Sequence, residues 1–159
     1  MVAAGVYDAA LRRALIAYKE RGRRDLARPL GDLLAAAVGE IAVSEVVLVP
    51  VPSSRRAAAG RGGDHMVRLA RCCDLPVVRA LRLGHRVLDS AGLDPQQRRS
   101  NLAGAFRSVP PQGVRSVVLI DDIVTTGATI DEARHALSAA GWHVIGAATV
   151  AATPLKFAR

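Results

Sequence analysis

The sequence has few aromatic residues and little cysteine, and both shortages exclude kinds of site. Aromatic side chains make up 3% of the 159 residues. They are too few and too scattered to form a stacking platform for single-stranded nucleic acid. The two cysteines, Cys72 and Cys73, are adjacent, so they cannot form a disulfide framework and are too few for a structural zinc site. We expect both thiols to pack at a helix end rather than to serve metal or redox chemistry.

Long apolar runs are also missing. Glu40 and Glu45 interrupt the longest candidate, which leaves it short of the ~20 residues needed to cross a bilayer. Residues 1–8 lack both the basic start and the apolar stretch of a signal peptide. We therefore expect a cytoplasmic protein without a membrane partner.

Acidic residues are outnumbered by basic ones. The chain has 22 Lys and Arg against 14 Asp and Glu, a net charge of +8, and a sequence pI near 10.9. An anionic partner is expected, and both a polyphosphate and the backbone of a nucleic acid qualify. The length and the hydrophobic share of 50% predict a single domain, residues 1–159, with a sizeable core.

Helical and strand patterns alternate along the chain. Two amphipathic helices open it, at residues 7–18 and from Asp25 or Pro29 to about Val38. Apolar runs predict strands at 45–51, 76–83 and 142–151, a short strand within 101–107, and a helix at 66–73. The alternation predicts an α/β fold with a mostly parallel central sheet flanked by helices.

One further strand leads directly into a polar loop. Residues 116–120 are largely β-branched and uncharged, as in a strand buried on both faces of a parallel sheet. Asp121 and Asp122 follow, and beyond them apolar residues recur at helical spacing up to Gly141. The apolar positions of this helix are Ile130, Ala133, Leu137 and Ala140. Because ligands bind at the carboxyl ends of strands in open α/β sheets, the loop is the predicted binding site.

The residue types in this loop favour a phosphate. A helix N-terminus presents unpaired N–H groups and partial positive charge, and Gly127 lets the backbone approach closely. Thr125, Thr126 and Thr129 add hydroxyl donors. Charge-assisted hydrogen bonds are worth about 1.5–3 kcal/mol each, so a few of them hold a phosphate monoester without a lysine.

Asp121 and Asp122 would repel that phosphate if they faced it, so they must address another part of the ligand. Adjacent strand residues point to opposite faces, so both acids can share a ligand only if the strand ends before Asp121. Carboxylates accept hydrogen bonds from a vicinal diol and hold Mg²⁺ through its water shell. A phosphorylated sugar with free hydroxyls satisfies the loop and the acids together. The alternative is that the acids cap a helix and that Gly127 only turns the chain.

A second loop follows the strand at 45–51. Prolines end that strand, and Ser53, Ser54, Arg55 and Arg56 come next. Arginine has the fork geometry that binds phosphate oxygens, although a solvated basic loop is the alternative. The polar segment 84–100 is predicted to be a mobile lid, because structureless segments of this length are commonly functional.

Two basic features are predicted to have minor roles. The turn at residues 19–24 is expected to be solvated, although Lys19 and Arg21 could reach a phosphate. His65, just before a predicted helix, is expected to be a surface or capping residue rather than a catalytic base.

The thirteen positions from Val117 to Thr129 resemble the phosphoribosyl pyrophosphate (PRPP) motif of type I phosphoribosyltransferases. Other segments resemble the ComF/GntX-like branch of that family, in the family's order. They are Tyr7 with Leu11–Arg13 and Lys19–Arg24, Val49–Pro52 with Arg55, Arg56, Arg61 and Gly62, Gly92 and Leu93 with Arg98, Arg99 and Asn101, and Gly104–Phe106. The family's N-terminal zinc ribbon has no counterpart among these 159 residues. Gly63, Asp64 and His65 stand where the family usually has an aromatic residue, Asn and Gln.

The resemblance implies a type I phosphoribosyltransferase fold with a small hood from residues 1–42, a core over 43–159 and the lid at 84–100. It implies transfer of ribose 5-phosphate from PRPP to a nitrogen acceptor, with release of magnesium pyrophosphate. The implied 5′-phosphate site is Thr125, Thr126, Gly127, Ala128 and Thr129. Asp121 and Asp122 are implied to hold the ribose diol, to favour an oxocarbenium-like transition state and to hold Mg²⁺ through water or PRPP. Ser53, Ser54, Arg55 and Arg56 are implied to take the pyrophosphate, with Arg98 or Arg99 brought to the leaving group.

Two other functions stay open at this point. The chain is alternatively a non-catalytic PRPP sensor, which the change at residues 63–65 favours, or a nucleic-acid-associated factor, which the net charge favours. No segment identifies the acceptor. Type I relatives often form dimers, so a homodimer is a further possibility.

Overall fold

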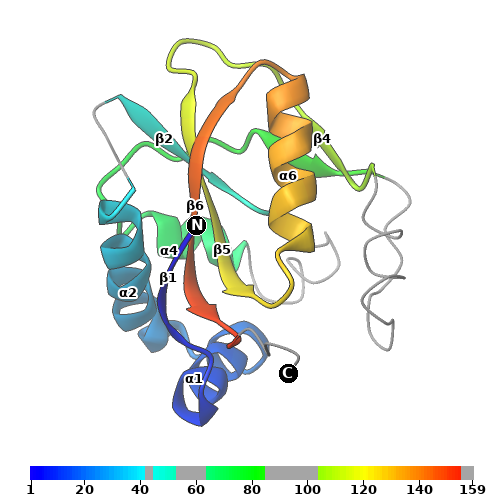
Figure 1. Ribbon diagram of the computed structural model, residues 1–159. Helices are drawn as coiled ribbons and strands as arrows, with labels where there is room; N and C mark the ends of the chain where they lie inside the picture. The colour runs from blue at the N-terminus through cyan, green and yellow to red at the C-terminus, as the bar shows by residue number, and fades with distance from the viewer. Residues whose placement is uncertain (42–44, 53–63, 85–103, 155–159) are drawn as a thin grey trace.

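Four parallel strands form the centre of the structure, in the order β1-β6-β5-β2 (Figure 1). The computed structural model describes residues 1–41, 45–52, 64–84 and 104–154. In chain order its elements are β1 (Val2–Val6), α1 (Ala9–Glu20), the 3-10 helix η1 (Arg24–Leu26), α2 (Ala27–Gly39), β2 (Val46–Pro50), α4 (His65–Ala70), β3 (Leu81–Leu83), β4 (Phe106–Ser108), β5 (Ser116–Val124), α6 (Ala128–Ala139) and β6 (His143–Ala152). Strands β3 and β4 pair antiparallel in a separate small sheet.

Both faces of the parallel sheet are covered. Val118 and Ile120 of β5 pack in one apolar cluster with residues of α1, α2 and α4. Val117 and Leu119, which alternate with them along the strand, pack in a second cluster with α6, β3 and β4. Figure 1 shows α2 and α6 on opposite sides of the sheet. The predicted α/β fold with a parallel sheet flanked by helices is confirmed.

Local sequence signals account for where the main elements begin and end. The Asp8 side chain caps α1 by accepting a hydrogen bond from the Leu11 N–H at 2.8 Å. Gly127 precedes α6 with φ +81°, and Gly141 follows it with φ +93°. This left-handed region suits glycine, because other residues meet a steric penalty there. The helix predicted to end at a glycine is therefore confirmed.

The strands of the structure differ from the predicted ones at three places. Strand β1 was not predicted; its Val-Ala-Ala-Gly-Val sequence has mostly small residues with weak strand preference, and pairing with β6 forms it. The strand predicted at 76–83 was wrong in extent, since only Leu81–Leu83 is a strand, and it belongs to the small sheet. Strand β5 continues four residues beyond its predicted end at Ile120, through both acids, to Val124.

Within the described ranges, no helix is both long enough and apolar enough to span a membrane.

Candidate functional site

The Thr/Gly loop, residues 125–129, lies between the carboxyl end of β5 and the N-terminus of α6. Thr125 and Thr126 are exposed, and Thr126 Oγ1 accepts a hydrogen bond from the Ala128 N–H at 3.4 Å. Gly127 has no side chain and turns the backbone into the first turn of α6. Exposed hydroxyls beside a helix N-terminus give the arrangement that binds an anion. The structure thus places the loop where the sequence predicts it.

Thr153 supports this loop from the end of the neighbouring strand. Its N–H donates to the Val124 carbonyl at 2.9 Å. Its hydroxyl contacts the carbonyls of Val124 and Thr125 at 3.4 and 3.3 Å. No local pattern predicts this role for Thr153, because a threonine after a strand carries no signal of the strand beside it.

Asp121 and Asp122 lie inside β5, so the predicted condition that the strand ends before Asp121 is not met. Successive strand residues point to opposite faces. Asp122 is on the face covered by α1 and α4 and is 5% exposed. Asp121 is partly buried and pairs in register with Thr149 of β6. Its Oδ1 accepts a hydrogen bond from the Asp122 N–H at 2.9 Å.

Asp122 is bound by two side chains from different helices. Lys19, in the last turn of α1, forms an ion pair with Asp122 Oδ2. His65, the first residue of α4, places Nε2 3.2 Å from the same oxygen. The Tyr18 hydroxyl donates to the His65 carbonyl at 3.0 Å, so α1 contacts α4 as well as β5. We call Lys19, His65 and Asp122 the buried charge cluster.

The two acids differ in their electrostatics. Burial opposes ionisation of Asp122, but the hydrogen bond with His65 and the charge of Lys19 outweigh it and lower the pKa of that carboxyl. Burial, followed by the neighbouring charge of Asp122, raises the pKa of Asp121 well above its usual value. Asp122 is therefore a firmly ionised, paired carboxylate, whereas Asp121 is the acid whose ionisation the folded protein disfavours.

Two predictions about basic residues are corrected by this cluster. His65 is 6% exposed and buried, not at the surface, and the capping residue of α4 is Asp64, whose Oδ1 accepts from the Met66 N–H at 3.0 Å. Lys19 is paired with Asp122 rather than solvated. The sequence pattern could not show these contacts, because they join residues that are 103 and 57 positions apart: Lys19 to Asp122, and His65 to Asp122.

The second half of the predicted site lies outside the described residues. This applies to Ser53, Ser54, Arg55, Arg56, Arg98 and Arg99, and to nearly all of the lid predicted at 84–100. These residues stay predictions from the sequence.

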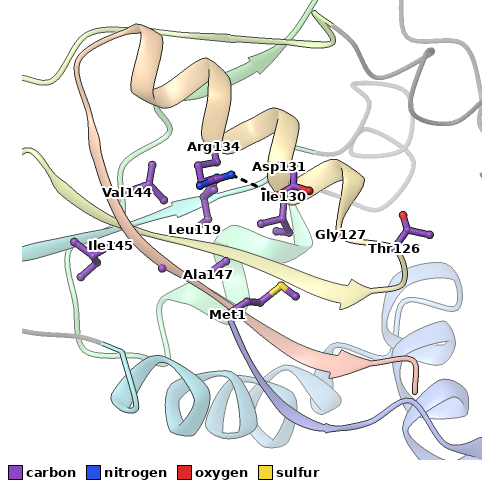
Figure 2. A pocket seen from close by; sticks show the side chains of 11 residues that line it. Met1, Leu119, Thr126, Gly127, Ile130, Asp131, Arg134, Val144, Ile145 and Ala147 are labelled. Atoms are coloured by element: carbon purple, nitrogen blue, oxygen red, sulfur yellow. Dashed lines mark ion pairs between the residues drawn. The ribbon is translucent and has the colours of Figure 1, made fainter. Parts of the chain in front are cut away.

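A pocket of about 370 Å³ opens on the α6 face of the sheet, beside the Thr/Gly loop (Figure 2). Arg134 and Asp131 of α6 form an exposed ion pair at 3.9 Å on its wall. Its floor comes from β5 and β6, with Met1 at one side. It is lined by Met1, Leu119, Thr126, Gly127, Ile130, Asp131, Arg134 and Val144–Ala147. Neither acid of β5 is among the lining residues, so this pocket is separate from the buried charge cluster.

No protein-family model matches the chain, and no curated protein does. Among solved structures, it is similar to glutamine PRPP amidotransferase from B. subtilis, with 20% identity and a TM-score of 0.49 over 84% of this chain and 30% of that one. It is similar to an allosteric regulatory enzyme of purine biosynthesis, with 21% identity and a TM-score of 0.48 over 82% of this chain and 29% of that one. It is also similar to orotate phosphoribosyltransferase from Aeropyrum pernix, with 27% identity and a TM-score of 0.42 over 87% and 62%. The chain spans about three tenths of the first two proteins. All three similarities are weak and identify no activity for this chain.

Proposed function

We propose that this chain binds PRPP and transfers its ribose 5-phosphate unit to a nitrogen acceptor, releasing magnesium pyrophosphate. One observation carries the proposal: two acids near the carboxyl end of the parallel strand β5 are followed, after two further strand residues, by an exposed Thr/Gly loop that opens a helix. The acids suit the hydroxyls of a sugar, and the loop suits a phosphate. PRPP presents both groups on one molecule.

The residues have distinct roles in this proposal. Thr125, Thr126, Gly127, Ala128 and Thr129 hold the 5′-phosphate. Asp122 accepts a hydrogen bond from the ribose diol, whereas Asp121 points to the opposite face of β5 and cannot share that diol. Ser53, Ser54, Arg55 and Arg56 bind the pyrophosphate, and Arg98 or Arg99 reaches the leaving group. We assign the chain to the ComF/GntX-like branch on the sequence segments that resemble it, with residues 1–42 as the acceptor-side hood.

The acids fit Mg²⁺ only in part. Carboxylate oxygens are the ligands that Mg²⁺ prefers, and the ion would neutralise the charge that grows on the leaving pyrophosphate. Within the described residues, no group of three His, Cys, Asp or Glu side chains could hold a metal, and Oδ2 of Asp122 is already paired. Mg²⁺ would therefore take most of its ligands from PRPP and water.

Thermal unfolding with and without Mg²⁺ and PRPP tests the proposal. Ligand at 100 times its dissociation constant stabilises a protein by about 2.7 kcal/mol, which raises Tm by roughly 5–11 °C for a domain of this size. Thr126→Val removes one loop hydroxyl and should reduce the shift. The matched control is Ser138→Ala, which removes an exposed hydroxyl from the other end of α6 and should leave the shift unchanged.

A pyrophosphate-release assay with purine, pyrimidine and amine acceptors then separates the possible functions. Release with one acceptor class supports the transferase and identifies its substrate. A thermal shift without release from any acceptor supports a non-catalytic PRPP sensor. The net charge of +8 keeps a nucleic-acid-associated role as a further candidate, and salt-sensitive DNA binding without a PRPP shift supports it. No shift at millimolar PRPP refutes both PRPP functions.

A further inference from the structure

The two carboxylate oxygens of Asp122 differ in their contacts. The Lys19 ammonium and the His65 ring nitrogen both bind Oδ2. Among the described residues, no contact with Oδ1 is found, and no buried side-chain oxygen or nitrogen there lacks a partner. Oδ1 is therefore the oxygen that solvent, or a ligand hydroxyl, can reach.

The helix that carries Lys19 also fixes His65. Tyr18, the preceding residue of α1, donates its hydroxyl to the His65 carbonyl and places its ring edge-on to the imidazole, with 6.3 Å between ring centroids. The side chains of His65 and Asp122 are 8% and 7% exposed, and that of Lys19 is 29% exposed. Three elements, α1, α4 and β5, thus meet at one carboxylate, and its orientation depends on contacts outside β5.

We propose that Lys19 and His65 are positioning residues for sugar recognition, acting through Asp122: they hold Oδ2 so that Oδ1 is directed to a hydroxyl of the ribose diol. The inference rests on the proposed function, because it needs a ribose phosphate in the site. It gives α1, a helix of the predicted hood, a role in recognising the ribose of PRPP. Neither residue needs to touch the ligand, because each acts by limiting the rotation of the Asp122 side chain.

Selectivity for the diol separates positioning from general support of the fold. The probes are ribose 5-phosphate and its 2-deoxy and 3-deoxy analogues, each lacking one hydroxyl, with binding measured by calorimetry. We expect the wild type to prefer ribose 5-phosphate over at least one analogue by roughly tenfold or more, since a hydrogen bond to a charged group is lost. In Lys19→Met and His65→Leu this preference should fall close to one. His65→Gln, which keeps a polar donor, should retain most of it.

The matched control is Arg13→Met, which removes an exposed positive charge from the same helix and should leave the preference intact. If His65→Leu does not fold, Lys19→Met and His65→Gln still decide the question. An equal loss of affinity for all three probes, with the preference unchanged, overturns positioning and leaves only a structural role. A wild type that binds PRPP but shows no preference also overturns it, while the proposed function survives. A wild type that binds neither PRPP nor ribose 5-phosphate refutes the proposed function itself.

Discussion

Replacing the two acids of β5 by asparagine, one at a time, should change stability in opposite directions. Asp122→Asn removes the charge that pairs with Lys19 and His65 and should lower the free energy of unfolding. Asp121→Asn removes a carboxyl whose ionisation the folded protein disfavours, so it should raise the free energy of unfolding. The two residues are adjacent and chemically identical, so the difference tests their environments rather than their type.

The size of the Asp122 effect follows from the burial of its partners. Removing one member of a fully buried ion pair costs about 3–5 kcal/mol, because the other charge is left unpaired. The Lys19 side chain is 29% exposed, so part of its charge returns to water and the cost is smaller, about 2 kcal/mol by that principle. With a urea dependence of about 2 kcal/mol per molar, the unfolding midpoint should fall by about 1 M.

The pH dependence separates the two acids further. The folded protein lowers the pKa of Asp122, so the stabilisation from this group is present above the unfolded pKa, about 4, and is lost as pH falls through the lower folded value. The loss in free energy of unfolding caused by Asp122→Asn should therefore be constant between about pH 5 and pH 8. The folded protein raises the pKa of Asp121, so this group favours folding at low pH and loses that effect as pH rises through its folded pKa. The gain in free energy of unfolding of Asp121→Asn over the wild type should grow with pH over that range.

Urea unfolding followed by circular dichroism at about pH 5 and pH 7 measures both effects. Asparagine can still accept the hydrogen bond from the Asp122 N–H, so Asp121→Asn tests charge alone. The control is Asp131→Asn, because Asp131 is an acid with a 71% exposed side chain and its loss should hardly change the midpoint. If both β5 variants are destabilised equally, or if Asp122→Asn matches the wild type, the assignment of one paired and one disfavoured carboxylate is wrong.

Two further predictions concern the Thr/Gly loop and the partly buried thiol of Cys73. Gly127→Ala places a side chain at φ +81°, which costs about 1–2 kcal/mol, so unfolding by urea should show that loss and PRPP affinity should fall with it; unchanged stability would contradict the left-handed geometry. Burial, followed by the neighbouring Cys72 and Asp74, raises the pKa of Cys73 to about 11. Cys72→Ser leaves burial, the larger cause, in place, so the remaining thiol should react with iodoacetamide at pH 8 roughly tenfold or more below the rate of an ordinary thiol, since only the thiolate reacts. A rate equal to that of a cysteine peptide would refute it.

Local patterns were enough to predict the unit formed by β5, the Thr/Gly loop and α6. The apolar run, the acids, the glycine with positive φ and the helical spacing all lie within residues 116–141, so neighbouring residues determine each step. Strands β2 and β6 were predicted for the same reason: β2 is a continuous buried apolar run, and β6 is a largely apolar run that is buried in its second half. The position of the loop at the carboxyl edge then follows from the parallel order of the strands.

Features that depend on distant contacts could not be predicted. Strand β1 has weak strand preference and forms because β6 offers it a free edge. The end of β5 was placed too early because acids are rare in strands, and here Lys19 and His65 offset the burial of Asp122. His65 looked like a surface residue because its partner is 57 residues away in the sequence.

The buried charge cluster also resolves a conflict that the sequence presents. Two carboxylates close before the predicted phosphate site would repel a phosphate, by about 4 kcal/mol per pair of charges 4 Å apart at a protein surface. Lys19 offsets the charge of Asp122, and the high pKa of Asp121 reduces its ionisation in the absence of ligand. The positive end of α6 then acts on the Thr/Gly loop against a reduced negative charge from the strand. The proposed phosphate site therefore depends on residues of α1 and α4, which reduce the charge of the strand that precedes it.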